Sequence, residues 1–514
     1  MADTLTAERQ RSARPRPLSP QAIAEVMTTG GDRRITLDPR TGLNQYMVAP
    51  RPSRAIAYSS STANDISAPA LAEIRRRLAT LAPDLMMDGD GYAEALEALR
   101  GRLRTALALP TDTEIAFAAS GTDLEYIGLS VAQRRDIRGI DTVLLGADEV
   151  GSGCALACVG AHYADRTPLG HAVARGDPIR ADKAPVRLFT VSLRDKGSKP
   201  IPSEDILIEI AAIAQAAIDA GRHPLVHVVH GSKTGLILPS LAHIDALRRR
   251  FGQSISFVVD ACQCRIAPAA IAAYLARGLT IFLTGSKFMG GPPFSGIALI
   301  PAAAARLSSG ILPGLERIFL RAEWPDRWPG AASLPHGANL GLLLRLEAAI
   351  YELELFQRLT AADIRRTLDL FDAAVGMLTE QLGAPRLAPT TGDAAGLMPD
   401  RPLEMRTLVT LDLGQAARPI DFAGAGHIHR MLVQDLRRYA CGTDNQAIAG
   451  QPIKLGQPVR CVTLADGTTG GTLRIGLSMP QMVAFAAMDG ASLASRLDAD
   501  MHAIATKMRI IGNL

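Results

Sequence analysis

The stretch from Ser256 to Pro301 constrains the fold of this chain more than any other part of its sequence. It contains an apolar run at Phe257–Val259, a second at Ile281–Leu283 and a third just before Pro301, with a glycine- and proline-rich turn between the last two. Short apolar runs bounded by turn residues are typical of strands buried on both faces of a mostly parallel sheet. The stretch therefore predicts an α/β fold.

Two of these runs each lead to a residue that can do chemistry. Asp260 directly follows the first run, and Lys287 follows the second after a short turn. Ligands bind beyond the carboxyl ends of such strands, so we expect both side chains to face one pocket. An amine and a carboxylate there suit pyridoxal phosphate (PLP), since lysine can hold its aldehyde as a Schiff base and the acid can keep its ring nitrogen protonated. Each residue alone could be an ordinary helix cap or surface lysine, but their order and spacing favour PLP.

The residues Asp260-Ala261-Cys262-Gln263, followed by Gly285-Ser286-Lys287, resemble a motif pair of the fold-type I PLP enzymes. The resemblance is to the class V aminotransferase and cysteine desulfurase branch. It implies a large α/β domain with a mostly parallel, seven-stranded sheet and a small C-terminal α+β domain. It also implies catalytic roles for Lys287 and Asp260 and cofactor contacts for Ser286 and Gln263, with Gln263 donating to the phenolate oxygen of the cofactor.

A second turn is expected to bind the phosphate of the cofactor. Ile115–Phe117 is interpreted as a strand, Ser120-Gly121-Thr122 as a turn, and the residues to about Gln133 as a helix. Free backbone N–H groups and the positive end of a helix dipole suit an anion. The resembling family holds the phosphate at this turn. The resemblance therefore assigns Gly121 and Thr122 to the cofactor, with Ser120 as a neighbour.

Two further cofactor positions are assigned by the resemblance, each with a substitution. Family members carry Asn-x-Thr-Gly where this chain has Ser232-Lys233-Thr234-Gly235, so Ser232 replaces the asparagine and can still form hydrogen bonds. Asn339 stands where relatives have Gly-Thr, which reaches into the phosphate pocket of the other subunit. The resemblance therefore implies a homodimer.

The substrate is expected to be a small molecule resembling an amino acid. Arg474, in Thr472–Ser478, matches the arginine of the family's Leu-Arg-Ile-Ser-Leu, which binds the substrate α-carboxylate through a bidentate fork. The hydroxyl-rich segment Ala55–Asp65 is loosely similar to one that lies beside the substrate, which assigns Ser61; a plain loop is an equal alternative. No cluster of metal ligands supports a metal site, and His427 and His429 are interpreted as an exposed helix start.

The chain departs from the family near Glu149. Class V members place a histidine or an aromatic residue after the corresponding strand, where it stacks on the pyridine ring. Glu149 or Val150 stands near that place here. Either His162 or Tyr163 supplies the stacking, or the ring rests on an aliphatic side chain.

Three activities are compatible with these motifs. The leading hypothesis is an aminotransferase that acts on an amino acid through Schiff base and quinonoid intermediates. The alternative is a PLP-dependent lyase or substitution enzyme, because Cys441 follows an alanine as the persulfide cysteine of cysteine desulfurases does; a structural cysteine is favoured. A domain that has lost activity is the third, and the intact set of Asp260, Lys287 and Arg474 argues against it.

Composition excludes several other classes of protein. The 55 basic and 51 acidic residues give a net charge of +4, too small to indicate a nucleic-acid partner. No apolar run is long enough to cross a membrane, and the N-terminus lacks the apolar core of a targeting peptide. Six cysteines without a disulfide-like pattern indicate a reducing compartment. A cytoplasmic protein is expected.

The chain is expected to divide into a tail and arm at residues 1–54, a PLP-binding domain at 55–384 and a small domain at 385–514. A helical pattern over residues 340–382 is expected to join the two domains. The segment 385–402 is rich in Pro, Gly, Thr and Asp, which makes it the best candidate boundary.

Overall fold

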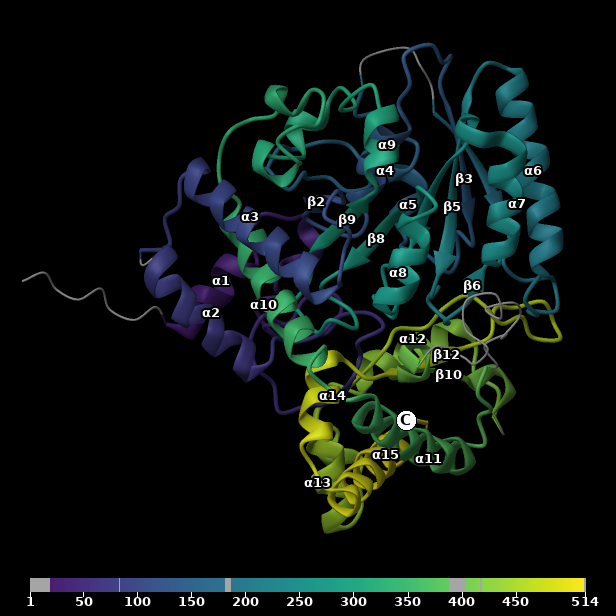
Figure 1. Cartoon of the computed structure of the whole chain (residues 1–514). Coiled ribbons are helices and arrows are strands. Elements are labelled where there is room, and N and C mark those ends of the chain that lie inside the picture. The colour runs from purple at the N-terminus through teal and green to yellow at the C-terminus, as the bar shows by residue number, and fades with distance from the viewer. Residues whose placement is uncertain (1–18, 83, 181–185, 388–402, 417, 513–514) are drawn as a thin grey trace, which may run out of the picture.

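The computed structural model of the chain describes residues 19–82, 84–180, 186–387, 403–416 and 418–512. Its central sheet has the strand order β2-β9-β8-β7-β5-β3-β4, and the short β6 pairs with β5 (Figure 1). The strands are β2 (Glu114–Ala118), β3 (Ile140–Leu145), β4 (Arg187–Val191), β5 (His223–His230), β6 (Ile237–Leu238), β7 (Ser256–Asp260), β8 (Thr280–Thr284) and β9 (Gly296–Ile300). Strands β4, β3, β5, β7 and β8 run parallel to one another, whereas β6 is antiparallel to β5 and β9 is antiparallel to both its neighbours. The predicted mostly parallel sheet is confirmed.

Strand β7 shows how a continuous apolar run is buried on both faces of the sheet. Phe257 and Val259 belong to one apolar core, whereas Val258 belongs to the core on the other face. Successive side chains of a strand point to opposite faces, so each run must be apolar throughout. The first core includes residues of α6 (Ser203–Asp219), α7 (Leu241–Phe251) and α8 (Pro268–Leu275), and the second includes α4 (Leu124–Ala132).

A group of helices covers the β2 end of the sheet (Figure 1). Helix α10 (Leu340–Phe356) is buried over most of its length and contacts three helices from the N-terminal part of the chain. These are α1 (Pro20–Met27), α2 (Ala68–Leu81) and α3 (Gly89–Ala106). The N-terminal arm is thereby attached to the large sheet.

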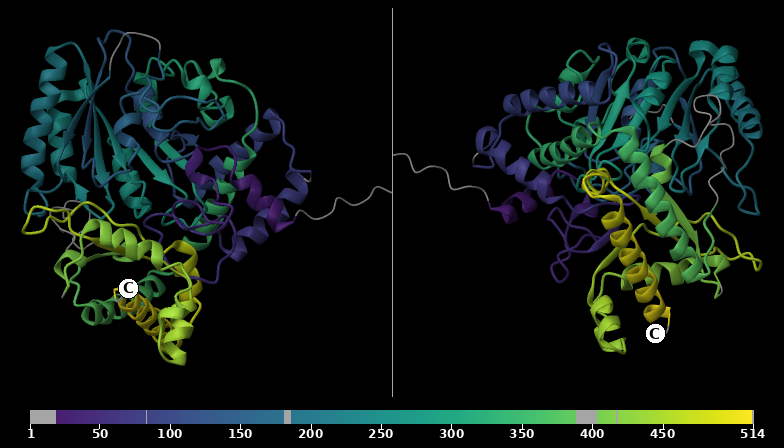
Figure 2. Two further views of the ribbon diagram at one scale, coloured as in Figure 1. Left: turned by 180° about the vertical axis from the view of Figure 1, so that it is seen from behind. Right: turned by 60° about the horizontal axis from the view of Figure 1, so that its bottom comes forward.

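The rest of the chain forms a smaller unit below the sheet (Figure 2). Two small sheets cross it: β10 (Leu408–Asp412) is antiparallel to β12 (Thr472–Gly476), and β1 (Ile56–Tyr58) is parallel to β11 (Ile453–Leu455). Its helices are α11 (Ala361–Leu382), α12 (Phe422–Met431), α13 (Thr443–Gly450), α14 (Met479–Ala486) and α15 (Gly490–Gly512); α5 (Cys154–Ala157) and α9 (Ala302–Leu307) are short helices of the upper unit.

The helical pattern over residues 340–382 is interrupted, contrary to the sequence-based expectation. Helix α10 ends at Phe356, and α11 begins after Thr360, whose hydroxyl accepts a hydrogen bond from the backbone N–H of Asp363 at 3.1 Å. Helix α11 then packs along α15 in the lower unit. The domain limits at residues 54 and 384 stay predictions. Most of the expected boundary at 385–402 lies outside the described residues, as do residues 1–18 of the expected tail and arm.

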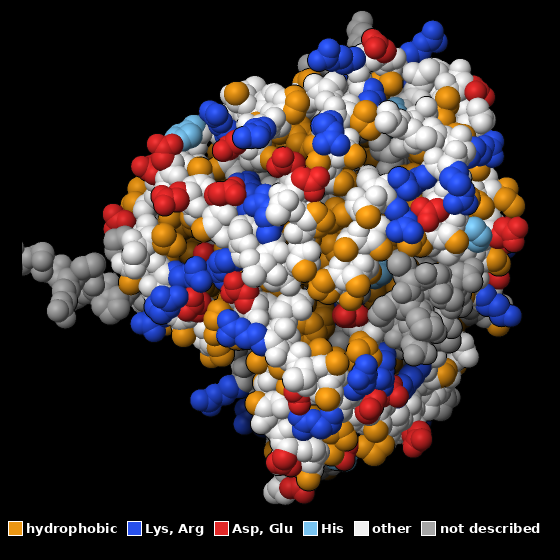
Figure 3. Space-filling model, viewed as in Figure 1, with side chains coloured by type: hydrophobic (Ala, Val, Ile, Leu, Met, Phe, Trp, Pro, Cys, Tyr) orange, Lys and Arg blue, Asp and Glu red, His pale blue; other side chains and the backbone are white. Residues whose placement is uncertain are grey.

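The surface carries both signs of charge. On the face in Figure 3, basic and acidic side chains are interspersed over the sheet unit and the lower unit. Among the helices that the structure describes, none is both long and apolar enough to cross a membrane.

Candidate active site

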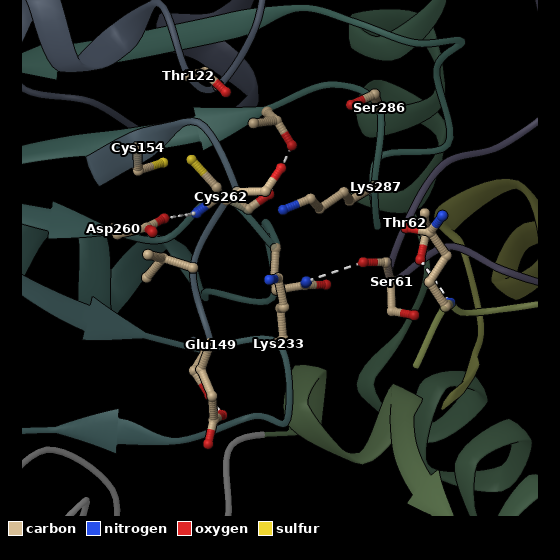
Figure 4. A pocket seen from close by; sticks show the side chains of 18 of the residues that line it. Ser61, Thr62, Thr122, Glu149, Cys154, Lys233, Asp260, Cys262, Ser286 and Lys287 are labelled. Carbon is tan, nitrogen blue, oxygen red and sulfur yellow. Dashed lines mark hydrogen bonds between the residues drawn. The ribbon is translucent and has the colours of Figure 1, made fainter. Parts of the chain in front are cut away.

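Asp260 and Lys287 line one cavity at the carboxyl ends of neighbouring parallel strands. Asp260 is the last residue of β7, and Lys287 stands three residues after the end of β8. The cavity encloses about 990 Å³, part of it open to solvent. Figure 4 shows the amine of Lys287 and the carboxylate of Asp260 projecting into the same space.

Asp260 is held in place by its own chain. Its Oδ1 accepts a hydrogen bond from the backbone N–H of Cys262 at 2.9 Å. Behind it, burial and then the charge of Asp260 raise the pKa of Glu125 well above its ordinary value. Nδ1 of His227 lies 3.1 Å from Oε2 of Glu125, and burial lowers the pKa of His227 to about 3. Burial therefore favours the neutral forms of Glu125 and His227, and the Asp260 side chain lines the cavity in front of them.

The turn that carries Lys287 is fixed by the segment before α2. Asn64 Nδ2 donates hydrogen bonds to the carbonyl oxygens of Ser286 at 2.9 Å and Lys287 at 2.7 Å. A Cβ at Gly285 would lie only 2.6 Å from Cβ of Ala349, so the turn approaches α10 as closely as glycine allows. These contacts hold the turn in place, with both Ser286 and Lys287 lining the cavity.

The predicted phosphate turn lies between β2 and α4 and lines the cavity. Ser120, Gly121 and Thr122 all contribute to its wall. A Cβ at Gly121 would lie 2.7 Å from Cγ2 of Thr284, so a larger residue would push the turn away from β8. The backbone N–H groups at the start of α4 and the two hydroxyls make a cradle suited to an anion.

Arg34 adds a positive charge to this cradle, and sequence analysis missed it. Its guanidinium donates hydrogen bonds to the hydroxyls of Ser120 and Thr122, each at 3.2 Å. It forms an ion pair with Asp32 at 2.7 Å and lies 4.9 Å from the ring centroids of both Tyr163 and Phe294. The side chain is thus fixed at the cradle by a carboxylate and two rings.

The acidic residue next to this cradle is buried. Asp123 accepts hydrogen bonds from the hydroxyls of Ser120 at 2.6 Å and Tyr163 at 2.9 Å. Burial raises the pKa of Asp123 to about 6. A bound phosphate close to this carboxyl would favour its protonated form further.

Gln263 lines the cavity with its amide in a fixed orientation. Its Nε2 donates to the carbonyl oxygen of Ser61 at 3.1 Å, and its Oε1 accepts from Nη1 of Arg265 at 2.7 Å. Arg265 also donates to the hydroxyl of Ser60 at 2.8 Å and to that of Thr407 at 2.8 Å. Burial lowers the pKa of Arg265 to about 9. The second N–H of the Gln263 amide stays available to a ligand.

Arg474 reaches the cavity from β12 of the lower unit. Its guanidinium donates to the carbonyl oxygens of Gln457 and Ser61, each at 3.0 Å, and to the hydroxyl of Thr62 at 2.9 Å. Burial lowers the pKa of Arg474 to about 10. No carboxylate of the described residues lies within ion-pair distance of it, so the charge of this guanidinium is available to an anion in the cavity.

Ser232 lines the cavity but its hydroxyl is engaged elsewhere. It donates to Oε2 of Glu149 at 2.6 Å, and Arg194 donates to Oε1 of the same carboxylate at 2.5 Å. Val150, and neither His162 nor Tyr163, contributes to the cavity wall after β3. Tyr163 instead faces Arg34 and Asp123, and which side chain stacks on a bound ring stays a prediction.

Three residues to which the sequence analysis gave possible roles, Asn339, Ser61 and Cys441, have the following surroundings. Asn339 caps α10, since its Oδ1 accepts from Leu342 N at 3.0 Å, and its Nδ2 donates to Gly30 O at 3.1 Å; a contact with a second subunit stays a prediction. The carbonyl oxygen of Ser61 accepts hydrogen bonds from Gln263 and Arg474, whereas its buried hydroxyl has no hydrogen-bond partner among the described residues. Cys441 is exposed and does not line the cavity.

No protein-family model and no curated protein sequence matches the chain. Among solved structures, the cysteine desulfurase CsdA of Escherichia coli is similar over 90% of this chain and 95% of its own, with 14% identity and a TM-score of 0.52. The chain has the cysteine desulfurase fold. A NifS-like protein is similar over 87% of this chain and 100% of its own, with 12% identity and a TM-score of 0.50. The resemblance to fold-type I architecture, stated from the motifs, is therefore confirmed for the fold.

Metal ligation receives no support within the part of the chain that the structure describes. No three His, Cys, Asp or Glu side chains there are grouped as the ligands of a metal ion would be. The polar groups of the cavity instead divide into an anion cradle at Thr122, a carboxylate at Asp260, an amine at Lys287 and a guanidinium at Arg474.

Proposed function

We propose that this protein is a PLP-dependent enzyme that acts on an amino acid, in the manner of the class V branch. The observation that carries the proposal is the placement of Asp260 and Lys287 at adjacent strand ends on one cavity, with an anion cradle on one side and Arg474 on another. The fold alone would not justify this, because one fold hosts many activities.

The residues of the cavity fit each polar part of PLP. Lys287 attaches the aldehyde, Asp260 faces the ring nitrogen, and the cradle with Arg34 binds the phosphate. Gln263 donates its free amide N–H to the phenolate oxygen, and its orientation is set by Arg265. Bound PLP supplies an electron sink for the electron pair released when a bond to Cα of the substrate breaks.

The protein residues then have separate tasks in the reaction. Arg474 binds the substrate α-carboxylate and so orients the Cα–H bond. Asp260 would keep a proton on the ring nitrogen, because a carboxylate beside the ring favours its protonated form. The Lys287 amine, when free, would take the proton from Cα as the general base.

Transamination is the reaction we propose. A desulfurase would need a nucleophilic cysteine that reaches the substrate, and Cys441 is exposed outside the cavity. Cys154 and Cys262 do line the cavity, but burial raises the pKa of both thiols well above the ordinary value. Such thiols are poor nucleophiles, because the thiolate is the reactive form.

The cofactor assignment is tested by reduction with borohydride. The purified protein should be yellow, and reduction followed by peptide mapping should find the label on Lys287. Lys287→Ala should fold and give no covalent label. A label that persists in this variant would exclude Lys287 as the attachment site.

The reaction is tested by the stoichiometry of the product. An aminotransferase given an amino donor alone should release one equivalent of keto acid per active site and then stop, and added keto acid acceptor should restart it. A lyase needs no acceptor. Steady turnover of a single amino acid without a keto acid would therefore contradict transamination.

The assembly and the compartment are also proposals. We propose a homodimer, because the resembling family completes its phosphate site with a residue of the neighbouring subunit. We propose a reducing compartment, the cytoplasm, and the six free cysteines support this.

A further inference from the structure

Lys233 is a second lysine on the wall of the cavity, and the tasks described above leave it unused. It lies in the turn after β5 and lines the cavity together with Lys287 (Figure 4). Arg474 lines the same cavity. Its Nζ donates a hydrogen bond to the carbonyl oxygen of Asp148 at 3.3 Å. An ammonium has three N–H groups, so two remain for a ligand. Within the described residues, no carboxylate lies at ion-pair distance from Nζ.

The cavity wall carries more positive side chains than carboxylates that can pair with them, and Lys233 is one of the unpaired cations. The charged residues that line it are Arg34, Glu149, Lys233, Asp260, Lys287 and Arg474. Glu149 is neutralised by Arg194 from outside the cavity, and Arg34 is paired with Asp32. Asp260 faces the ring nitrogen in the proposed function. Lys233 and Arg474 are therefore two cations that form no ion pair with a described carboxylate, and only the more distant charge of Glu149 acts on them.

The environment of Lys233 makes an unpaired positive charge on its side chain energetically unfavourable. Burial, and then repulsion by Arg474 and Lys287, lowers the pKa of Lys233 to about 8. A partly desolvated cation is stabilised by an anion that replaces its lost hydration. The cavity therefore favours a ligand with an anionic group at Lys233.

Lys233 is well placed to act together with Arg474. The carbonyl oxygen of Lys233 accepts a hydrogen bond from Nη1 of Arg474 at 3.4 Å, so both residues belong to the same side of the cavity. Thr122, at the phosphate cradle, lies at the opposite end, with Lys287 between (Figure 4). The anion that Lys233 binds is therefore not the cofactor phosphate but part of the substrate.

We propose that the substrate is an amino acid with a carboxylate in its side chain, and that Lys233 binds this second carboxylate while Arg474 binds the first. This inference rests on the proposed function and adds to it the class of substrate. It makes Lys233 a specificity-determining residue, because an amino acid with an apolar side chain would leave its ammonium unpaired.

The inference is tested by the binding of unreactive acids that lack an amino group. Isothermal titration calorimetry of the purified protein at pH 7 compares the dicarboxylates succinate and glutarate with the monocarboxylates butyrate and valerate, which have the same chain lengths. We expect the better dicarboxylate to bind about tenfold or more tightly than its monocarboxylate, as for one partly buried ion pair. In Lys233→Met this preference should be lost, whereas Lys233→Arg should keep it.

Lys196→Met is the matched control, because it removes one positive charge from an exposed side chain outside the cavity. Its preference should equal that of the unmodified protein. Equal binding of mono- and dicarboxylates by the unmodified protein, or an unchanged preference in Lys233→Met, would overturn the inference. Because no turnover is needed, failure to label Lys287 with borohydride would contradict the proposed function separately, while the dicarboxylate preference would still decide the role of Lys233.

Discussion

At the scale of single residues, Asp260 is a carboxylate held in a fixed position. The backbone N–H of Cys262 orients it, and burial favours the neutral forms of Glu125 and His227 behind it. Its contribution should therefore be electrostatic, and a variant that keeps the shape but removes the charge should separate binding from turnover.

Asp260→Asn should still bind PLP and should lose turnover by about 100- to 1000-fold, the range for losing one preorganised electrostatic contact. The measurement is the turnover number, with cofactor content determined by absorbance. Asp245→Asn is the control, since that carboxylate lies on α7 outside the cavity, where it pairs with Arg277. Full activity in Asp260→Asn would show that the carboxylate serves only as a cap for the turn.

The sequence predicted those site residues that stand at strand ends within motifs. Asp260, Lys287 and Gly121 follow apolar runs, so their convergence at one edge of the sheet follows from the topology of a parallel sheet. Arg34 and Lys233 could not be found in this way. Arg34 comes from an irregular arm, and its position depends on pairing with Asp32 and on two rings from distant segments.

At the scale of elements, the N-terminal arm should be part of the phosphate site. Arg34→Met should lower the affinity for PLP by about tenfold or more, because a charge-assisted contact to the cradle is lost. Titration of the apoprotein with PLP, followed by fluorescence, measures this change.

Arg33, which directly precedes Arg34, provides the control for the PLP titration. Arg33→Met removes a surface ion pair with Asp165, in which the side chain of Arg33 is 77% exposed, and should leave PLP affinity unchanged. Equal losses in the two variants would mean that the arm acts through its total charge and not through the contact of Arg34.

The break between α10 and α11 illustrates what periodicity does not reveal. Residues 340–382 keep helical character on both sides of the break, so the pattern alone predicts one helix. The local signal is Thr360, an N-cap with Asp363 three residues later. Such a cap competes with continuation of the helix, and here the packing of α11 on α15 accompanies the new direction.

At the scale of the whole molecule, a buried carboxyl should make stability depend on pH. Glu323 accepts hydrogen bonds from Tyr92 Oη at 3.1 Å and from Leu320 N at 2.9 Å, and burial raises its pKa from 4.5 to about 8. Between these values the folded chain keeps a proton that the unfolded chain releases. The contribution of Glu323 to the free energy of unfolding therefore falls as pH rises from about 4.5 to 8.

Glu323→Gln should remove this pH-dependent contribution to the free energy of unfolding. The variant should therefore gain stability relative to the unmodified protein as pH rises. Thermal unfolding at pH 5 and at pH 8.5 measures the difference, and Glu316→Gln, at an exposed position, serves as the control. A stability difference between Glu323→Gln and the unmodified protein that is the same at both pH values would contradict the assignment.

The proposed homodimer also belongs to this scale. Sedimentation equilibrium at working concentrations should give twice the mass of one chain, because the resembling family completes each site with the neighbouring subunit. A monomer with full activity would contradict the dimer and would also remove the role proposed for Asn339.

The pairing of β1 with β11 has a consequence for biosynthesis. Ser61, just after β1, and Arg474 meet through a hydrogen bond although they are 413 positions apart in the chain. During translation β7 and β8 emerge and can pair long before Arg474 leaves the ribosome. The nascent chain therefore carries Lys287 at the edge of a formed sheet while the opposite wall of its pocket has not yet been synthesised. Only a chain translated past Arg474 can close the site, so this wall of the pocket is completed well after β7 and β8 have been synthesised.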